Sequence, residues 1–254
     1  MKFTLIGLGE VGSRFAAALL SAGHEVAGYV RNPEKVEIQG VRLAGSTAEA
    51  IQGADVVISA VWASAAEEVA AQACDGRTAY VDVTNVGIEA THRMSGLPGF
   101  HKGAILAPVA RHGARAPMLL AGPEAERLAG ILNGCGFNVR AVGTEPRQAA
   151  AIKILRSIAT KCIVALLHDM TDAARAYGVE DQVLESAGEF FATEPFPDLA
   201  RTLLKQSAIH AERLAGEMDE IAEALREVGG PERVPDLARE VFLEIARQSG
   251  AVRS

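Results

Sequence analysis

Apolar and polar positions follow two different patterns along the chain, and the change falls near residue 145. In the first part, short apolar runs alternate with helix-length segments that are rich in Ala and punctuated by Gly. Continuous apolar strands that alternate with helices are typical of a mostly parallel sheet with both faces covered. The apolar runs predict strands at residues 3–7, 25–30, 41–44, 55–61, 78–84, 104–109, 118–121 and 139–142. We therefore expect residues 1–145 to form an α/β domain of the Rossmann type, with a doubly wound sheet.

After Gly143 the strand pattern stops and helical periodicity takes over. After Pro146 the next Gly or Pro is Gly178, which predicts one long helix over this stretch. Further helical patterns follow at residues 179–191, 198–227 and 235–248, separated by Pro and Gly. Residues 146–254 are therefore expected to form a smaller, all-helical domain that begins with a long interdomain helix.

The composition narrows the class of protein. Of the 254 residues, 49% are hydrophobic and 22% are charged, which excludes a disordered or collagen-like chain. The 32 Asp and Glu residues exceed the 25 Lys and Arg residues, giving a net charge of −7. This excess argues against broad nucleic-acid binding, which depends on neutralising phosphates. No apolar run reaches the roughly 20 residues that span a bilayer, and the first residues lack the apolar core of a signal peptide. We expect a cytoplasmic protein with no nucleic-acid or membrane partner.

The three cysteines are far apart in the sequence and show no CxxC spacing; they are Cys74, Cys135 and Cys162. An odd, scattered set predicts free, buried thiols in a reducing compartment rather than disulfides or a metal site.

The strongest chemical signal is a glycine-rich turn near the N-terminus. The first predicted strand runs directly into a GxGxxG motif, and a helix follows. In this arrangement the first Gly permits the tight turn, the second lets the backbone approach a pyrophosphate, and the third lets the helix pack against the strand. The helix N-terminus then favours the negative charge of the pyrophosphate. We predict a dinucleotide site here, rather than a turn without a ligand, formed by Gly7, Leu8, Gly9, Glu10, Val11 and Gly12.

The end of the second predicted strand indicates which dinucleotide binds. An NAD site usually has Asp or Glu at this point, where it accepts a hydrogen bond from the ribose 2′-hydroxyl. This chain has Arg31 and Asn32, with Lys35 nearby. A guanidinium pairs with a 2′-phosphate through two hydrogen bonds and stacks on aromatic rings such as adenine. We predict that NADP (NADPH) is preferred over NAD; the alternative is that Arg31 is a solvated surface charge.

Two further predicted strands end in small or polar residues. Open α/β sheets bind ligands at the carboxyl ends of their strands. We therefore expect Val61 and Trp62 beside the cofactor ribose, and Thr84 and Asn85 beside the nicotinamide. Trp62 is the only Trp in the chain, and a packed loop aromatic is the alternative interpretation for it.

A polar stripe runs along the predicted long helix and includes Lys153, Ser157 and Lys161, at about 100° per residue. A solvated helix face explains Lys161 equally well. Lys153 differs, because it lies near the start of the helix, where the α/β domain ends. A lysine there can donate a proton to a substrate oxygen or accept one. Partial burial and a positively charged nicotinamide would both lower its pKa toward the working range.

Together these motifs resemble the β-hydroxyacid dehydrogenase superfamily, which includes 6-phosphogluconate, 3-hydroxyisobutyrate and tartronate-semialdehyde enzymes. Residues 153–157, Lys161 and residues 217–220 are more similar to a branch with a short C-terminal helical domain of formerly unknown function. The resemblance places Lys153 at the catalytic lysine of the family, the proton donor to the carbonyl, and implies a homodimer in which the helical domains pack together. It rests on residues 7–12, 23–26, 31–33 and 151–153.

Two segments depart from the family pattern. The family usually has Asn one helical turn after the lysine, where this chain has Ser157, which reaches less far. The family's substrate loop, roughly Asp-x-Pro-Val-Ser-Gly-Gly, has the Ser and both Gly replaced in residues 106–113. We expect Arg111 and His112 to contact an anionic group of the substrate there, with an exposed loop pair as the alternative. Lys205 is a further candidate for substrate contact on a later helix.

The resulting hypothesis is an NADP-dependent oxidoreductase that moves a hydride between the nicotinamide and a small carbonyl or alcohol substrate of the hydroxyacid type. Lys153 would act as the general acid and base, and Ser157 would orient the substrate. One alternative is an NADPH-dependent imine reductase, since related imine reductases share the N-terminal motif. The other is a non-catalytic NADP-binding sensor, which the lysine disfavours because a sensor has no need of a proton donor.

Overall fold

The computed structural model describes the backbone of residues 1–35 and 38–252 and, within these ranges, all side chains except those of residues 35 and 249–252. The Lys35 side chain, an expected neighbour of Arg31, thus lies outside the described residues. The chain divides by its internal contacts into two compact units, Met1–Ile158 and Ala159–Ser254. This division falls within helix α7 (Arg147–Tyr177). The domain boundary at residues 145 and 146 remains a prediction.

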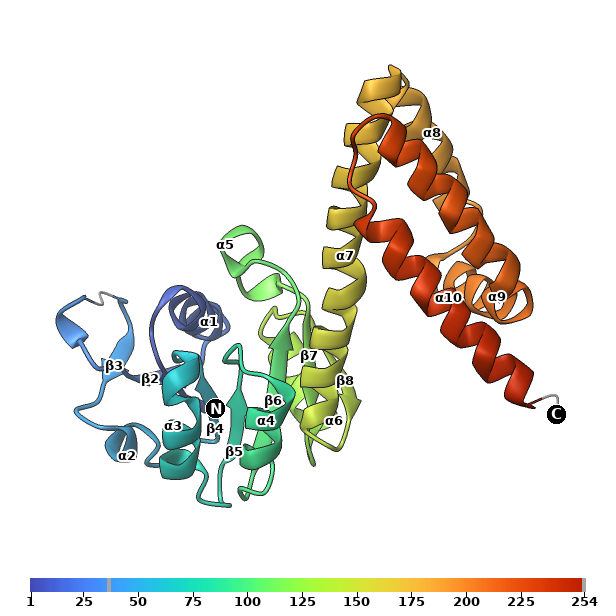
Figure 1. Ribbon diagram of the computed structural model, residues 1–254. Helices are drawn as coiled ribbons and strands as arrows, with labels where there is room; N and C mark the ends of the chain where they lie inside the picture. The colour runs from blue at the N-terminus through green and yellow to red at the C-terminus, as the bar shows by residue number, and fades with distance from the viewer. Residues whose placement is uncertain (36–37, 253–254) are drawn as a thin grey trace. The chain divides into compact units, whose positions relative to one another are not determined.

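The first unit contains an eight-stranded sheet with the order β3-β2-β1-β4-β5-β6-β7-β8 (Figure 1). Strands β1 to β6 are parallel, β7 is antiparallel to β6, and β8 is parallel to β7. The predicted α/β fold with a mostly parallel sheet is therefore confirmed. The strands are β1 Lys2–Ile6, β2 Glu25–Tyr29, β3 Val41–Leu43, β4 Val56–Ser59, β5 Ala79–Asp82, β6 Phe100–Ile105, β7 Met118–Ala121 and β8 Val139–Gly143.

The strand order reverses at β1. The chain passes from β1 outward to β2 and β3, and then returns to place β4 on the other side of β1. In open α/β sheets the crevice at such a switch point, beside the carboxyl ends of the strands, is where ligands bind. The fold therefore places the GxGxxG turn, which follows β1, at the expected binding edge.

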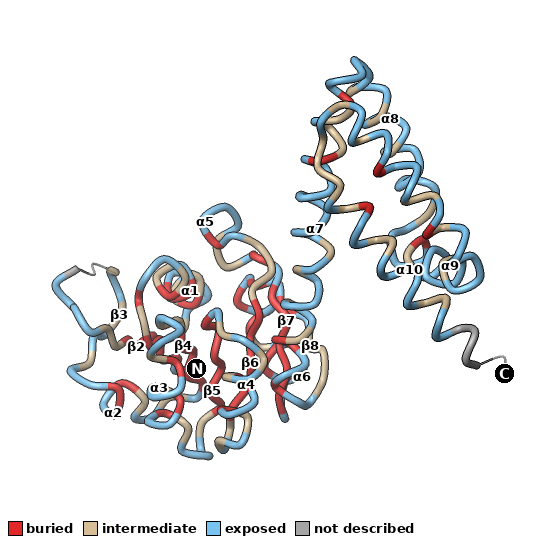
Figure 2. Tube along the Cα trace, in the orientation of Figure 1, coloured by how far each residue is buried: buried red, intermediate tan, exposed pale blue. Residues whose placement is uncertain are grey.

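Helices cover both faces of the sheet, because alternate residues of each strand point to opposite faces. Helices α1 and α6 pack on one face around Phe3, Leu5 and Val81. Helix α3 packs on the other face around Ile6 and Tyr80, and Figure 2 shows the buried strands between these layers. The helices of this unit are α1 Glu10–Ser21, α2 Thr47–Ala50, α3 Ala66–Ala73, α4 Ile88–Met94, α5 Val109–His112 and α6 Ala125–Gly134, with 3-10 helices η1 Pro33–Lys35, η2 Ala63–Ala65 and η3 Gly113–Arg115.

One predicted strand is displaced along the sequence. The apolar pattern predicts a strand at residues 104–109, whereas β6 spans Phe100–Ile105. Two polar residues, His101 and Lys102, are buried inside β6. They interrupt the apolar run, so the pattern of apolar residues does not predict the first half of this strand. Pro108 precedes α5 and has no N–H to give to a strand ladder, so the strand cannot continue where the pattern placed it.

The second unit is all-helical, as predicted. Helix α10 is tied to α7 by an ion pair of 2.7 Å between Arg233 and Asp169. The Tyr177 hydroxyl at the end of α7 donates to the Ala224 carbonyl oxygen in α9 at 3.0 Å. Besides α7, its helices are α8 Glu180–Phe191, α9 Phe196–Glu227, which is kinked at His210, and α10 Arg233–Val252.

The three cysteines are free. Cys135 is buried and Cys74 is half-buried, and burial raises the pKa of the Cys74 thiol to about 12. Cys162 is exposed on α7, so the expectation of a buried thiol is wrong at this position. Cys162 belongs to the helical unit, which buries few of its side chains, and no other helix in the described part of that unit covers this residue. No helix among the described residues has the length and apolar character needed to cross a membrane.

Candidate active site

The first strand passes into a tight turn that only glycine permits. Gly7 has a φ of +89°, a conformation that L side chains rarely adopt. A Cβ atom on Gly7 would lie 2.5 Å from the Ala60 carbonyl oxygen, and one on Gly12 would lie 1.8 Å from the Gly7 carbonyl oxygen. The Gly7 N–H donates to the Tyr29 carbonyl oxygen at 2.8 Å, which ties the turn to the end of β2. Glycine at both positions is therefore required for α1 to start against the end of β1.

Gly9 has the opposite surroundings. It is the N-cap residue of α1, and a Cβ atom built on it would have no atom within 4 Å. No side chain among the described residues caps this helix N-terminus. Open space beside uncapped N–H groups fits the pyrophosphate of a dinucleotide. The side chains of Leu8 and Val11 pack in the core, so we expect these residues to contribute through their backbone.

Arg31 and Asn32 follow β2 at the same edge of the sheet, and both side chains are exposed. They come shortly after Tyr29, whose carbonyl oxygen binds the turn. Arg31 thus presents its charge at the edge that also carries the glycine turn. Its predicted contact with a 2′-phosphate remains a prediction.

The end of β4 meets the glycine turn. The Val61 Cγ1 atom lies 3.2 Å from the position of a Cβ on Gly7, so this residue is next to the turn. Trp62 is 86% exposed, which rules out the alternative of a packed loop aromatic. An apolar indole left in solvent beside a candidate ligand site is available for stacking on a ligand.

The end of β5 carries a buried hydroxyl group. Thr84 is buried, and its Oγ1 atom has no hydrogen-bond partner among the described residues. Buried polar atoms are normally hydrogen bonded, so this atom at the carboxyl edge of the sheet fits a polar group of a ligand. Asn85, the next residue, is exposed. The structure therefore places both predicted nicotinamide contacts at the binding edge, one of them with an unsatisfied group.

A buried ion pair lies below this edge, and the sequence patterns do not reveal it. Asp82 ends β5, and Lys102 is its register partner on β6. The Lys102 Nζ atom lies 2.5 Å from Asp82 Oδ2 and also donates to the Thr84 carbonyl oxygen at 2.5 Å. Burial lowers the pKa of Lys102, and the charge of Asp82 opposes this effect. The available sequence signal was an Asp at the end of one buried strand and a Lys inside the next, a pairing that only the strand register reveals.

Lys153 lies near the start of α7, in the same unit as the turn, and is half-buried. Burial lowers the pKa of its ammonium group, and the positive charges of Lys102 and Arg156 lower it further, whereas Asp82 raises it. Ser157, one turn later, donates its hydroxyl hydrogen to the Lys153 carbonyl oxygen at 2.9 Å. That bond directs the hydroxyl hydrogen to the helix backbone. The catalytic roles of Lys153 and Ser157 remain predictions.

The predicted substrate loop is held by two helices. Arg156 Nη2 on α7 donates to the Leu106 carbonyl oxygen at 3.0 Å, and α5, which follows in the chain, packs against α1. Arg111 and His112 end α5, and both are exposed. This exposure is consistent with a contact to an anionic substrate group, and equally with two ordinary surface residues.

The two remaining predicted contacts lie in the helical unit. Lys161 is on α7 and Lys205 is on α9, and both are exposed. Their contact with substrate remains a prediction.

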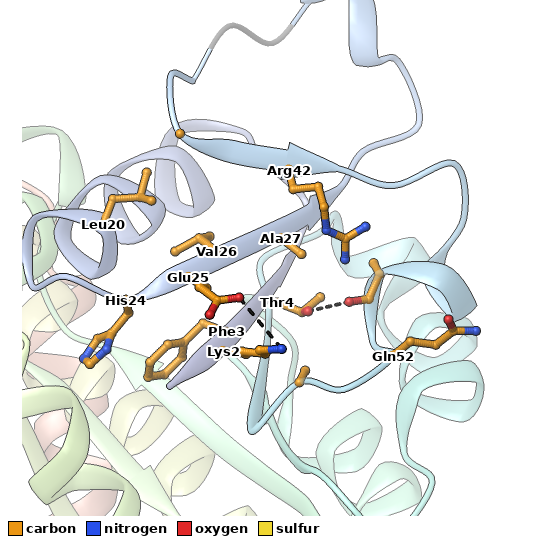
Figure 3. A pocket seen from close by; sticks show the side chains of 13 residues that line it. Lys2, Phe3, Thr4, Leu20, His24, Glu25, Val26, Ala27, Arg42 and Gln52 are labelled. Atoms are coloured by element: carbon orange, nitrogen blue, oxygen red, sulfur yellow. Dashed lines mark hydrogen bonds and ion pairs between the residues drawn. The ribbon is translucent and has the colours of Figure 1, made fainter.

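A separate hollow lies at the opposite edge of the sheet. Its volume is about 400 Å³, and it is lined by residues at the amino ends of β1 and β2, among them Lys2, Thr4 and Glu25 (Figure 3). Lys2 and Glu25 form an ion pair of 3.9 Å across it, and the Thr4 hydroxyl is satisfied by the Ala50 carbonyl oxygen at 2.6 Å. None of the predicted site residues lines this hollow. It is therefore distinct from the candidate active site.

Two family models match different parts of the chain. Residues 2–113 match the NAD binding domain of 6-phosphogluconate dehydrogenase. Residues 174–245 match a domain of unknown function, DUF1932. The first match contains the glycine turn and the ends of β2, β4 and β5, and the second lies wholly in the helical unit.

Known proteins are similar over most of the chain. A solved conserved protein of unknown function, described as structurally similar to 3-hydroxyacid dehydrogenases, is 34% identical, with 98% of this chain and 99% of that chain covered and a TM-score of 0.67. An uncharacterized 28.5 kDa protein of Methanothermus fervidus is 29% identical over 84% of this chain and 86% of its own length. An imine reductase from Aspergillus terreus, solved with NADPH4 and dibenz[c,e]azepine, shares the fold at 19% identity, with a TM-score of 0.77 and coverage of 97% and 94%.

The glycine turn, the strand order and these similarities confirm the resemblance to the β-hydroxyacid dehydrogenase superfamily. The chain belongs to the NAD(P)-dependent dehydrogenases and reductases of the 3-hydroxyacid dehydrogenase type, in a branch whose C-terminal helical region is the DUF1932 domain.

Proposed function

We propose that this protein transfers a hydride between NADP(H) and a small carbonyl or alcohol substrate, with Lys153 as the general acid and base. The observation that carries the proposal is the state of the Lys153 amine: it is half-buried, and burial and two nearby cations lower its pKa. A general acid works best when its pKa lies near the operating pH, because both protonation states are then accessible. A solvated surface lysine has neither feature.

The residues that would hold the cofactor follow from the geometry of the first unit. The backbone from Gly7 to Gly12 would bind the pyrophosphate at the start of α1, and Arg31 would pair with the 2′-phosphate. Val61 and Trp62 would lie beside the ribose, and Thr84 would bind a polar group of the nicotinamide. When bound, the cofactor supplies or accepts the hydride.

The chain's own residues handle the proton. Hydride arrival at a carbonyl carbon places negative charge on the oxygen, and the Lys153 ammonium group donates a proton to that oxygen. In the reverse direction the neutral amine accepts the proton of the alcohol. Arg111 and His112 would bind an anionic group of the substrate and fix its orientation.

An imine reductase and a sensor without turnover are the alternatives. Assays of NADPH consumption with a panel of carbonyl compounds, and with carbonyl compounds plus amines, separate the three. The proposal requires turnover of a carbonyl without added amine. Turnover that depends on the amine favours the imine reductase, and cofactor binding without any turnover favours the sensor.

We also propose that the protein is a homodimer. In the described part of the second unit the buried apolar side chains are one leucine, one proline and four alanines: Ala174, Leu199, Ala211, Ala215, Ala222 and Pro235. Larger apolar side chains remain exposed, including Leu204 at 71% and Leu237 at 64%. Exposed apolar surface of this kind marks an interaction site. A second copy of this chain can cover it, so no different protein is required.

We also propose a cytoplasmic location, because the free cysteines fit a reducing compartment.

Cofactor choice should depend on Arg31. NADPH should bind at least about tenfold more tightly than NADH, which corresponds to roughly 1.4 kcal/mol. Arg31→Ala should remove most of this difference, because it deletes the cation that would pair with the 2′-phosphate. Fluorescence titration with both cofactors measures the effect, and Arg127→Ala, which changes an exposed arginine on α6, is the control. Equal affinities in the unmodified protein would contradict the proposal.

Removal of the Lys153 amine should stop proton transfer. Lys153→Met keeps the apolar stem, so we expect kcat to fall by about 10²–10⁴-fold, with little change in NADPH affinity or Tm. Ser157→Ala should cost less, because it removes a single hydrogen bond. Near-normal turnover of Lys153→Met would place the proton donor elsewhere.

The rate of the unmodified enzyme should depend on pH through Lys153. For reduction, kcat/KM should decrease as pH rises through the pKa of Lys153, since the ammonium form is required. For alcohol oxidation, kcat/KM should increase over the same range, since the neutral amine is required.

Substrate binding should weaken without Arg111. If its guanidinium binds an anionic group, Arg111→Ala should lower kcat/KM by about 30-fold, or about 2 kcal/mol, with cofactor affinity unchanged. Arg115→Ala, in the adjacent η3, is the matched control. An unchanged kcat/KM would assign Arg111 and His112 to an ordinary surface.

The dimer should form through the apolar faces of the helical unit. Sedimentation velocity should give twice the mass of one chain. Leu204→Glu should weaken the association by introducing a charge into apolar surface, whereas Gln206→Glu, a new charge two residues away, should have a smaller effect. A monomer at micromolar concentration would refute the proposed dimer.

A further inference from the structure

The buried pair of Lys102 and Asp82 is an unusual use of charge in the core of a sheet. The two side chains are 2% and 0% exposed and lie on neighbouring parallel strands. Replacing a buried ion pair with apolar residues of similar volume is often neutral or stabilising, so such a pair is weak evidence for a role in stability. A parallel sheet with helices on both faces is normally filled by Val, Ile and Leu. The position of the pair therefore calls for an explanation other than packing.

The pair makes hydrogen bonds to the backbone of the segment that follows β5. Lys102 Nζ binds both Asp82 Oδ2 and the Thr84 carbonyl oxygen, and the Thr84 N–H donates to Asp82 Oδ1 at 3.1 Å. Two hydrogen bonds thus hold the backbone of Thr84, and the ion pair joins the two side chains that make them. Thr84 also carries the buried hydroxyl that has no partner among the described residues. This is the segment proposed to meet the nicotinamide.

The same pair lies close to Lys153. Lys102 and Ala104 are two residues apart on β6 and therefore share a face, and Ala149 and Lys153 are four apart on α7 and share a face. Ala104 and Ala149 pack in one buried cluster. This contact brings the start of α7 onto the face of the sheet that holds Lys102, and Lys153 lies one turn further along the helix.

We propose that Lys102 is a positioning residue of the active site, whose ammonium group, held by Asp82 and the Thr84 carbonyl, both fixes the end of β5 and places a buried positive charge beside Lys153. This inference rests on the proposed function of Lys153 as acid and base. The charged groups that act on Lys153 are Lys102 on β6, Arg156 on α7 and Asp82 on β5. Lys102 opposes the ammonium form of Lys153 more strongly than Asp82 favours it. Arg156 is exposed, so water and salt screen its charge more effectively.

The direct test measures the titration of Lys153 in the full-length protein without cofactor. Acetic anhydride reacts with the neutral amine, so pulse labelling between pH 6 and 11, followed by mass spectrometry of the peptide that contains Lys153, gives the midpoint. The double variant Asp82→Asn/Lys102→Met removes both charges without leaving one of them buried alone. We expect its midpoint to rise, so that labelling at a fixed pH below the midpoint slows about tenfold, equivalent to about 1.4 kcal/mol.

Two variants separate charge from structural damage. Lys102→Arg keeps the positive charge but forces a larger group into the site, so the midpoint of Lys153 should stay low. Arg93→Met, which breaks an exposed ion pair with Glu67 on the same unit, should also leave it unchanged. If the double variant does not fold, as judged by circular dichroism, Asp82→Leu/Lys102→Met replaces the pair with an apolar one and carries the same expectation.

The outcomes distinguish this inference from the proposed function. An unchanged or lowered midpoint in a folded variant without the pair would overturn the role of Lys102, and so would an equal rise in Lys102→Arg. Either result leaves catalysis by Lys153 intact. Conversely, if Lys153→Met keeps its turnover, the proposed function fails, whereas the labelling midpoint still reports the charge of Lys102. Where both hold, the pH dependence of kcat/KM should shift in the same direction as the labelling midpoint.

Discussion

The close approach of α1 to the end of β1 is the constraint on which the candidate site depends. A Cβ on Gly12 would lie 1.8 Å from the Gly7 carbonyl oxygen, so any side chain there would push the helix away from the strand. With glycine, the helix starts directly at the carboxyl edge of the sheet, and its uncapped N-terminus points its N–H groups at the space beside Gly9. The same turn contacts the ends of β2 and β4. One backbone contact therefore determines where an anionic cofactor fits and which neighbouring residues surround it.

The buried Lys102–Asp82 pair stabilises the carboxyl edge of the sheet from within. The helix N-terminus offers partial positive charge to a phosphate, and the Lys102–Asp82 pair stabilises the backbone at the end of β5 by hydrogen bonds. Lys153 then combines burial with nearby like charge, and both disfavour its ammonium form. The features that would bind the cofactor and those that would tune the proton donor thus lie on one sheet, in one compact unit. The helical unit, with few buried side chains of its own, contributes exposed apolar surface instead.

Much of this architecture could be predicted from the sequence, because its signals are local. Apolar runs and Gly punctuation place seven of the strands closely, and breaks at Pro and Gly delimit the helices of the second unit. Strand β6 was misplaced, because two buried polar residues in it, His101 and Lys102, look like a surface segment when the pattern alone is considered. The Lys102–Asp82 pair could not be predicted, since it depends on the register between two strands. The exposure of Cys162 was also missed, because helical periodicity shows which residues share a face and not whether another element covers that face.

A structure of the protein with bound NADP⁺ and a slowly reacting alcohol or a carbonyl analogue tests the central claim most directly. We expect the pyrophosphate to lie on the backbone N–H groups at the start of α1. We also expect the substrate oxygen to lie within hydrogen-bond reach of Lys153 Nζ, at about 2.6–3.2 Å. A substrate oxygen held by another proton donor, with Lys153 turned away from it, would show that Lys153 is not the general acid.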